Sequence, residues 1–130
     1  MRELLRRLET LFRGLRRYNP PVAPTGVTAV PGGGSGETQV TWDPVPGDAT
    51  VAQYRVYKRH GTGTFELLAV VTHSALGLLE PGRFGIVDAP DYWPWASGAD
   101  ASAKRCYAVT AVSDQGLEGP MSALTCVLPP

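Results

Sequence analysis

The feature that most constrains the fold is a succession of short runs in which apolar and polar residues alternate. Alternation with a period of two is typical of strands that bury one face, and closely spaced turn residues favour an antiparallel β-sandwich. The chain of 130 residues holds 15 Gly and 12 Pro, mostly between these runs, so they indicate turns rather than disorder. We predict an all-β domain with seven strands, at 26–31, 37–42, 52–59, 65–71, 83–88, 105–113 and 121–128.

Alternate positions within these runs predict which side chains face the core. Val40 and Trp42 share one face of their strand, as do Tyr54 and Val56 in the next one. A chain of this length can bury one core of common size but not two. The expected core residues include Trp42, Tyr54, Val56, Tyr107 and Val109.

The first 19 residues have a different character. They hold six Arg and two Glu, a formal charge of +4, and because the whole chain is neutral the remainder carries −4. Their large apolar residues fall within an arc of about 120° on a helical projection, which predicts an amphipathic helix. These residues are Leu4, Leu5, Leu8, Leu11, Phe12 and Leu15. Pro20 ends the helix, residues 20–25 form a Pro-rich linker, and residues 26–130 form the sandwich.

A helix of this length is marginal on its own in water, so it needs a surface to lie against. Docking on a protein subunit is favoured, because burial of the six apolar side chains contributes about 10 kcal/mol before ordering costs. A membrane surface is a second candidate, since the basic face suits anionic lipids. Nucleic acid is not favoured, because the arginines spread over more than half of the circumference without a base-reading set. An unpartnered tail is the fourth alternative.

Export and catalysis find little support in the sequence. Arginines interrupt every apolar run near the N-terminus, which argues against a signal peptide, and the longest later run, at 67–71, is too short to cross a membrane. His60 and His73 are interpreted as loop residues and Asp88 as a turn residue after a strand. No metal set, nucleophile motif or phosphate-binding loop is recognised, so we predict no metal, no cofactor and no enzymatic activity.

The segments PTGVTAV, VTWDPV, YRVYKR and YAVTAVSDQGLEGPMS resemble a fibronectin type III domain in order and spacing over residues 24–130. In that family the residues that match Trp42 and Tyr54 pack between the two sheets, and a V-x-A-V run corresponds to Val109–Val112. The chain departs from the family at the tyrosine corner, where Arg105 and Ala99 stand in place of Tyr and Leu. The resemblance implies a fold, whereas function must come from a site.

Cys106 and Cys126 are the only cysteines in the chain. If strands 105–113 and 121–128 form a hairpin about residue 116, these two residues face each other and point away from the core. Cross-strand neighbours of the non-hydrogen-bonded kind have Cβ atoms close enough for a disulfide. A disulfide, a contacting thiol pair and two unlinked residues are the alternatives.

The connection at 89–103 contains an aromatic group formed by Tyr92, Trp93 and Trp95. These rings either fold back to plug the open end of the sandwich or contact a protein neighbour. A carbohydrate ligand is the least favoured alternative.

Taken together, these features predict a non-enzymatic structural or binding protein. Short fibronectin-like domains without a signal peptide are similar to virion components of tailed bacteriophages, and this analogy implies a capsid decoration, a head–tail part or a tail part. The expected partners are protein subunits of a larger assembly, and self-association is also allowed. A bacterial envelope or extracellular module that binds protein or carbohydrate is the alternative function, and a cytoplasmic location is the alternative to the virion.

Overall fold

The computed structural model describes residues 20–32, 36–46, 50–89 and 104–128. The predicted helix over 1–19 and the aromatic residues of the 89–103 connection lie outside these described residues. The described part consists of eight strands and one short 3₁₀ helix. They are β1 (Thr28–Pro31), β2 (Thr38–Trp42), β3 (Val51–His60), β4 (Glu66–Thr72), η1 (Ala75–Gly77), β5 (Leu78–Glu80), β6 (Arg83–Asp88), β7 (Arg105–Ser113) and β8 (Thr125–Val127).

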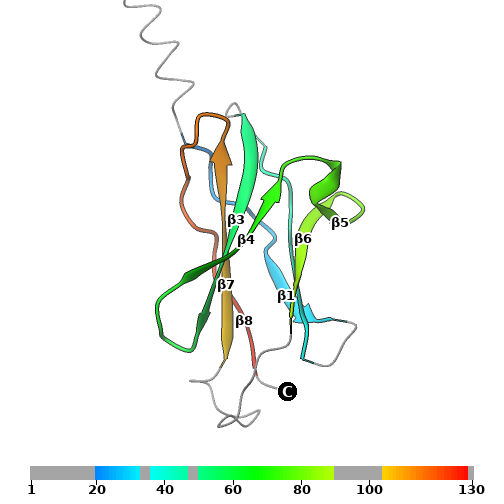
Figure 1. Cartoon of the computed structure of the whole chain (residues 1–130), viewed down its shortest axis with the longest axis vertical. Helices are drawn as coiled ribbons and strands as arrows, with labels where there is room; N and C mark the ends of the chain where they lie inside the picture. The colour runs from blue at the N-terminus through cyan, green and yellow to red at the C-terminus, as the bar shows by residue number, and fades with distance from the viewer. Residues whose placement is uncertain (1–19, 33–35, 47–49, 90–103, 129–130) are drawn as a thin grey trace, which may run out of the picture.

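The strands form two antiparallel sheets that pack face to face (Figure 1). One sheet has the order β1-β2-β6-β5, and the other has the order β4-β3-β7-β8. The predicted all-β class and its two antiparallel sheets are therefore confirmed. No helix in the described ranges has both the length and the apolar character that a bilayer span requires.

The predicted number of strands was wrong, because the described chain has eight and not seven. The additional strand is β5, which lies within the predicted connection between the strands at 65–71 and 83–88. It is only three residues long and exposes Leu78 and Leu79, so it shows no alternation of buried and exposed positions. Pairing with β6 defines it, and such pairing is invisible to a local pattern.

The last strand is shorter than predicted. β8 covers Thr125–Val127 rather than the whole of 121–128. In the residues before β8, a side chain takes part in the contact with β7. Ser122 Oγ accepts a hydrogen bond from the Val109 N–H at 3.0 Å. Pro120 has no N–H to donate, which prevents a regular ladder from extending back through this stretch.

The core lies between the sheets, where Trp42, Tyr54, Val56, Tyr107 and Val109 are completely buried. At one end of the core an aromatic cluster forms around Tyr54. Its ring lies 5.5 Å from that of Trp42 and 4.9 Å from that of Phe84.

His73 is part of this cluster, although the sequence analysis interpreted it as a loop residue. It directly follows β4, stacks on Phe84 with ring centroids 5.1 Å apart, and has Nδ1 at 2.7 Å from the Tyr54 hydroxyl. The other histidine, His60, is the last residue of β3 and is exposed. His73 is therefore partly buried, although it lies in the connection that follows β4.

At the other end of the core the inward positions are occupied by charged residues. Lys58 follows Tyr54 and Val56 on the inner face of β3, and Asp88 occupies the inner face at the end of β6. Lys58 Nζ lies 2.7 Å from Asp88 Oδ2, and both side chains are almost fully buried. The interpretation of Asp88 as a turn residue was wrong, because its carboxylate binds a lysine of the opposite sheet.

The same Asp88 oxygen has two further neighbours on β7. The Tyr107 hydroxyl donates a hydrogen bond to it at 2.6 Å, and Arg105 Nη1 lies 3.7 Å away. Arg105 also donates from Nη2 to the Gly36 carbonyl oxygen at 2.9 Å. Burial, reinforced by the hydrogen bond to Asp88, raises the pKa of Tyr107 well above its ordinary value of 10.0. Tyr107 is therefore a neutral donor at physiological pH.

These contacts predict that Asp88→Asn destabilises the fold by about 3–5 kcal/mol, because it removes the buried negative charge that Lys58 and Arg105 face. Tyr107→Phe removes the hydroxyl that donates to Asp88 and should lower the free energy of unfolding by about 1–2 kcal/mol. Urea unfolding at pH 7 measures both changes. Asp43→Asn is the matched control, because the Asp43–Arg83 ion pair is much more exposed and its loss should change the free energy by less than about 1 kcal/mol. Equal effects at positions 43 and 88 would contradict this prediction.

Candidate functional site

The N-terminal segment joins the sandwich at the end that carries the 114–119 turn. Pro21 is fully buried, and a side chain at Gly119 would overlap the Pro21 carbonyl oxygen. The Thr25 carbonyl oxygen then accepts a hydrogen bond from the Asp43 N–H at 3.0 Å. The predicted linker over 20–25 therefore packs against the sandwich. The predicted helix residues of the 1–19 segment are attached at this end, where the described chain begins in Figure 1.

The 90–103 segment is attached at the opposite end. It leaves after Asp88 and Ala89 and returns at Lys104 and Arg105, next to the end of β3. Arg105 is the cross-strand partner of His60, and the Gly61 N–H donates to the Lys104 carbonyl oxygen at 2.7 Å. The two segments that the sequence analysis selected as contact sites are therefore joined to opposite ends of one sandwich.

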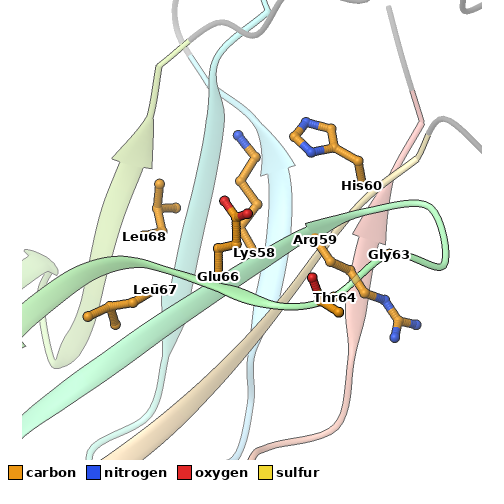
Figure 2. Close-up of a pocket in the computed structure, with 8 residues that line it drawn as sticks. All are labelled: Lys58, Arg59, His60, Gly63, Thr64, Glu66, Leu67 and Leu68. Carbon is orange, nitrogen blue, oxygen red and sulfur yellow. The ribbon is translucent and has the colours of Figure 1, made fainter.

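A cavity of about 400 Å³ opens at the β3–β4 hairpin, on the end that carries the 90–103 segment (Figure 2). Its polar lining residues include Lys58, His60, Thr64 and Glu66. In Figure 2 the Lys58 amine, the His60 ring and the Glu66 carboxylate lie on one side of the hairpin, whereas the Arg59 guanidinium lies on the other side. The cavity combines hydrogen-bond donors with a carboxylate acceptor, an arrangement that suits a small polar ligand.

A second polar cluster lies on the outer face of the β4-β3-β7-β8 sheet, around Glu118. Its carboxylate accepts hydrogen bonds from Tyr57 Oη, from Thr110 Oγ1 at 2.6 Å and from Arg55 Nη1 at 3.2 Å. Glu118 reaches these strands because its backbone forms a bridge with Val112, next to the turn at 113–117. The cluster fixes the 114–119 loop to the sheet.

The hydrogen bonds to Glu118 change the acidity of both acidic partners. Burial alone would raise the pKa of Glu118, but the donors Thr110 and Tyr57 and the positive charge of Arg55 hold it below 4.5. Burial raises the pKa of the Tyr57 hydroxyl, and the hydrogen bond to Glu118 adds to the shift. Glu118 is therefore ionised and Tyr57 neutral at physiological pH, a combination that stabilises the structure rather than preparing a proton transfer.

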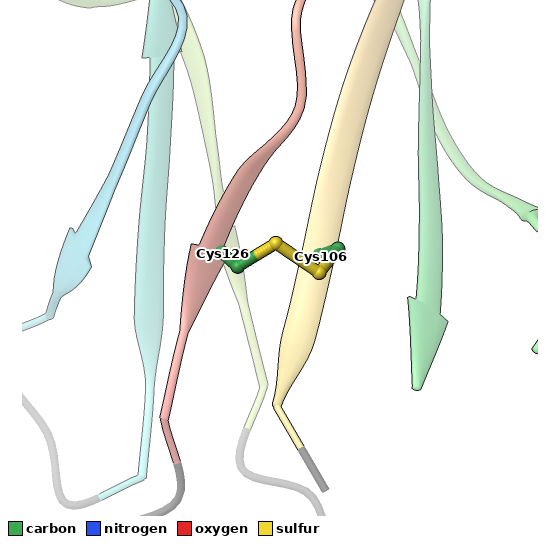
Figure 3. The surroundings of a disulfide bond; sticks show 2 residues. All are labelled: Cys106 and Cys126. Carbon is green, nitrogen blue, oxygen red and sulfur yellow. A yellow bond between two sulfur atoms is a disulfide. The ribbon is translucent and has the colours of Figure 1, made fainter. Parts of the chain in front are cut away.

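A disulfide joins Cys106 of β7 to Cys126 of β8 (Figure 3). The two residues are direct cross-strand partners, with Cα atoms 4.0 Å apart. Cys106 is completely buried, although it lies on the outer side of the sheet, and Cys126 is exposed. The bond ties the short edge strand β8 to the centre of the sandwich.

Neither polar cluster was selected from the sequence. For the buried pair of Lys58 and Asp88, the signal in the sequence was the alternation of the strands, because both residues continue the apolar inner positions of β3 and β6. No group of three or more His, Cys, Asp or Glu residues within the described ranges has the geometry of a metal site. Asp91 and the aromatic residues Tyr92, Trp93 and Trp95 lie outside those ranges.

The Glu118 cluster predicts a specific dependence of stability on pH. The pKa of Glu118 is lower in the folded chain than in the unfolded chain, so its contribution is complete above pH 4.5 and is lost as the pH falls through the folded value. The melting temperature of the wild type should exceed that of Glu118→Gln by a constant amount between about pH 7 and 5, and the difference should close below about pH 4. Differential scanning calorimetry across this range tests the prediction. A difference that persists at the lowest pH would contradict it.

The disulfide should make a large contribution to stability, because it links residues separated by 20 positions. A Cys106→Ala/Cys126→Ala variant should lose about 3 kcal/mol and melt roughly 10 °C lower. Reducing agent should shift the wild type by a similar amount and leave the double variant unchanged. Alkylation of the unfolded, unreduced chain followed by mass spectrometry provides the chemical check, and two alkylated cysteines would show that the bond is absent.

No protein-family profile and no curated protein sequence matches the chain. Among solved structures, the chain is similar to a β-1,2-glucanase from Parabacteroides distasonis, with 18% identity and a TM-score of 0.51. The similarity covers 85% of this chain but only 12% of the glucanase. Pectate lyase Pel3 from Pectobacterium carotovorum also matches, with 16% identity, a TM-score of 0.49, and coverage of 80% of this chain and 26% of the lyase. The chain thus spans a small part of each protein, and the glucanase match shows a shared fold alone.

Proposed function

We propose that this chain is a non-enzymatic structural and binding module that connects two components of a larger protein assembly. The observation that carries this proposal is the attachment of the 1–19 and 90–103 segments to opposite ends of the sandwich. The amphipathic helix predicted over 1–19 inserts its Leu and Phe face into a groove of a structural subunit. The sandwich then holds the aromatic 90–103 connection at a distance, where it meets a second partner.

The connections between the strands support an immunoglobulin-like sandwich of the fibronectin type III kind. If the strands are lettered A, B, C, C′, D, E, F and G in chain order, the sheets read A-B-E-D and C′-C-F-G. This arrangement is the one that immunoglobulin-like domains use, in which A, B, E and D form one sheet and C, F and G belong to the other.

The internal pairing of the charged residues supports a structural role. Asp88 binds residues of the opposite sheet, and Glu118 ties the 114–119 loop to the outer face of its own sheet. Both carboxylates therefore hold parts of the sandwich together. A rigid body with its two ends fixed relative to each other suits a connector.

The assembly that we propose is a bacteriophage virion, in which the chain acts as a capsid decoration, a head–tail part or a tail part. The disulfide supports an exposed virion surface over the cytoplasmic alternative, because disulfides persist outside the reducing cytosol.

A second candidate function is an extracellular or bacterial envelope module that binds protein or carbohydrate. The cavity at the β3–β4 hairpin favours it, because its lining places the polar side chains of His60, Thr64 and Glu66 beside the ends of the aromatic 90–103 connection. Aromatic rings and polar side chains together recognise sugar rings. This second candidate predicts that the purified chain binds a soluble glycan, whereas the connector proposal does not require such binding.

Two matched variants of the predicted helix test the connector. Leu8→Glu/Leu11→Glu places charges in the centre of the apolar face and should abolish incorporation into purified particles, measured by mass spectrometry. Arg6→Glu/Arg13→Glu changes the opposite face and should retain incorporation. The melting temperature of each variant, compared with that of the wild type, checks that the sandwich still folds.

The two variants also separate the competing partners of the helix. Incorporation that survives Leu8→Glu/Leu11→Glu would contradict the anchor. Loss of association through the arginine variant, accompanied by salt-sensitive binding of anionic vesicles or of DNA by the wild type, would indicate a membrane or nucleic-acid partner instead.

A further inference from the structure

In the described part of the chain four strands lie at the edges of the two sheets, and three of them are poor templates for further pairing. β5 and β8 have three residues each, and β1 has four residues and ends at Pro31. Short length and proline are devices by which sheet edges avoid association with other chains. The fourth edge strand, β4, lacks this protection.

β4 spans seven residues, ELLAVVT, with neither Lys, Arg nor Pro, and its single charge is at its first residue, Glu66. Within the described ranges it pairs with β3 alone. Two of its apolar side chains are half exposed, Leu67 at 53% and Val70 at 52%. An edge strand presents a row of backbone N–H and C=O groups, and an apolar one is a site of association.

The charged neighbour of Val70 does not cover this surface. Arg55 is the cross-strand partner of Val70 in β3, but its guanidinium binds Glu118, which is bridged to β7 on the far side of β3. The outer surface at β4 therefore stays apolar. The Glu118 cluster holds the arginine away from it.

We propose that β4 is a self-association surface, where a second copy of the chain adds its own β4 antiparallel across a two-fold axis. Centred on Val70, such pairing places Val70 opposite the partner's Val70 and Ala69 opposite the partner's Val71. Ala69 and Val71 both pack against the core, so inner residues meet inner residues and outer residues meet outer residues. The strand is therefore complementary to itself in this register.

Charge supports a second copy as the occupant. In the Val70-centred register Glu66 lies opposite residue 74, beyond the end of the partner's β4, so the two glutamates do not face each other. Val70 opposite Val70 is a β-branched cross-strand pair, which stabilises antiparallel sheets. No other charge lies within the strand to oppose the pairing.

The interface should be weak, because the strand is irregular near its start. The register between β3 and β4 shifts between Val56 and Tyr57, where Leu68 is the additional residue of β4. Because Thr72 lies opposite the partner's Leu68 in the Val70-centred register, this bulge confines regular pairing to residues 69–71 and leaves a small interface. We therefore expect a dimer with a dissociation constant on the order of 10–100 µM.

Sedimentation velocity of the full chain tests the proposal, with matched variants of equal exposure. Val70→Lys places two lysines opposite each other and should weaken dimerisation at least tenfold. Val87→Lys is the control, because Val87 is 50% exposed on the outer face of the other sheet. It should dimerise like the wild type.

A covalent test distinguishes this surface from any other dimer contact. Under mild oxidation Val70→Cys should form a disulfide-linked dimer in high yield, whereas Val87→Cys should not. A wild type that stays monomeric at about 500 µM would overturn the proposal. A dimer that survives Val70→Lys, through the N-terminal helix or elsewhere, would also overturn it.

Discussion

The buried carboxylate of Asp88 is the interaction on which the arrangement of the sandwich depends. It belongs to β6 of one sheet and receives Lys58 and Tyr107 from β3 and β7 of the other. Most of the inter-sheet packing is apolar and therefore not directional, whereas this group specifies which residues face each other. Because its members are almost fully buried, each one depends on the others. The group also fixes the end of the sandwich where the 90–103 connection leaves and returns.

The two ends of the sandwich are closed by different means. Trp42, Tyr54, Phe84 and His73 form an aromatic cluster at one end, and the ionic group around Asp88 fills the inner positions at the other. Arg105 contributes to the ionic end through Asp88 and Gly36.

The outer surface of the β4-β3-β7-β8 sheet combines a polar centre with an apolar edge. One side chain of β3, Arg55, is committed to Glu118 and thereby anchors the 114–119 loop. The consequence is an apolar edge at β4 next to a polar centre of the sheet. The ion pair between Arg55 and Glu118 thus leaves the outer surface at β4 apolar.

Particular residues show how far the sequence could predict this structure. Alternation identified the inner faces of β2, β3 and β7 because a strand turns successive side chains to opposite sides, whatever its neighbours are. The symmetry argument about residue 116 placed Cys106 opposite Cys126, as observed, although the bridge nearer the turn, between Val112 and Glu118, is centred on residue 115. These features follow from geometry within one strand or one hairpin.

The sequence alone therefore determined the all-β class, the core faces and the cysteine register, because local backbone geometry encodes each of them. Tertiary structure decided the rest: β5 exists because β6 pairs with it, and His73 joins the aromatic cluster because Phe84 and Tyr54 reach it from other strands. The pairing of Lys58 with Asp88 joins residues 30 positions apart across two sheets. A charged residue at an inner position can only be interpreted once its partner is known, and that partner comes from the packing of the whole sandwich.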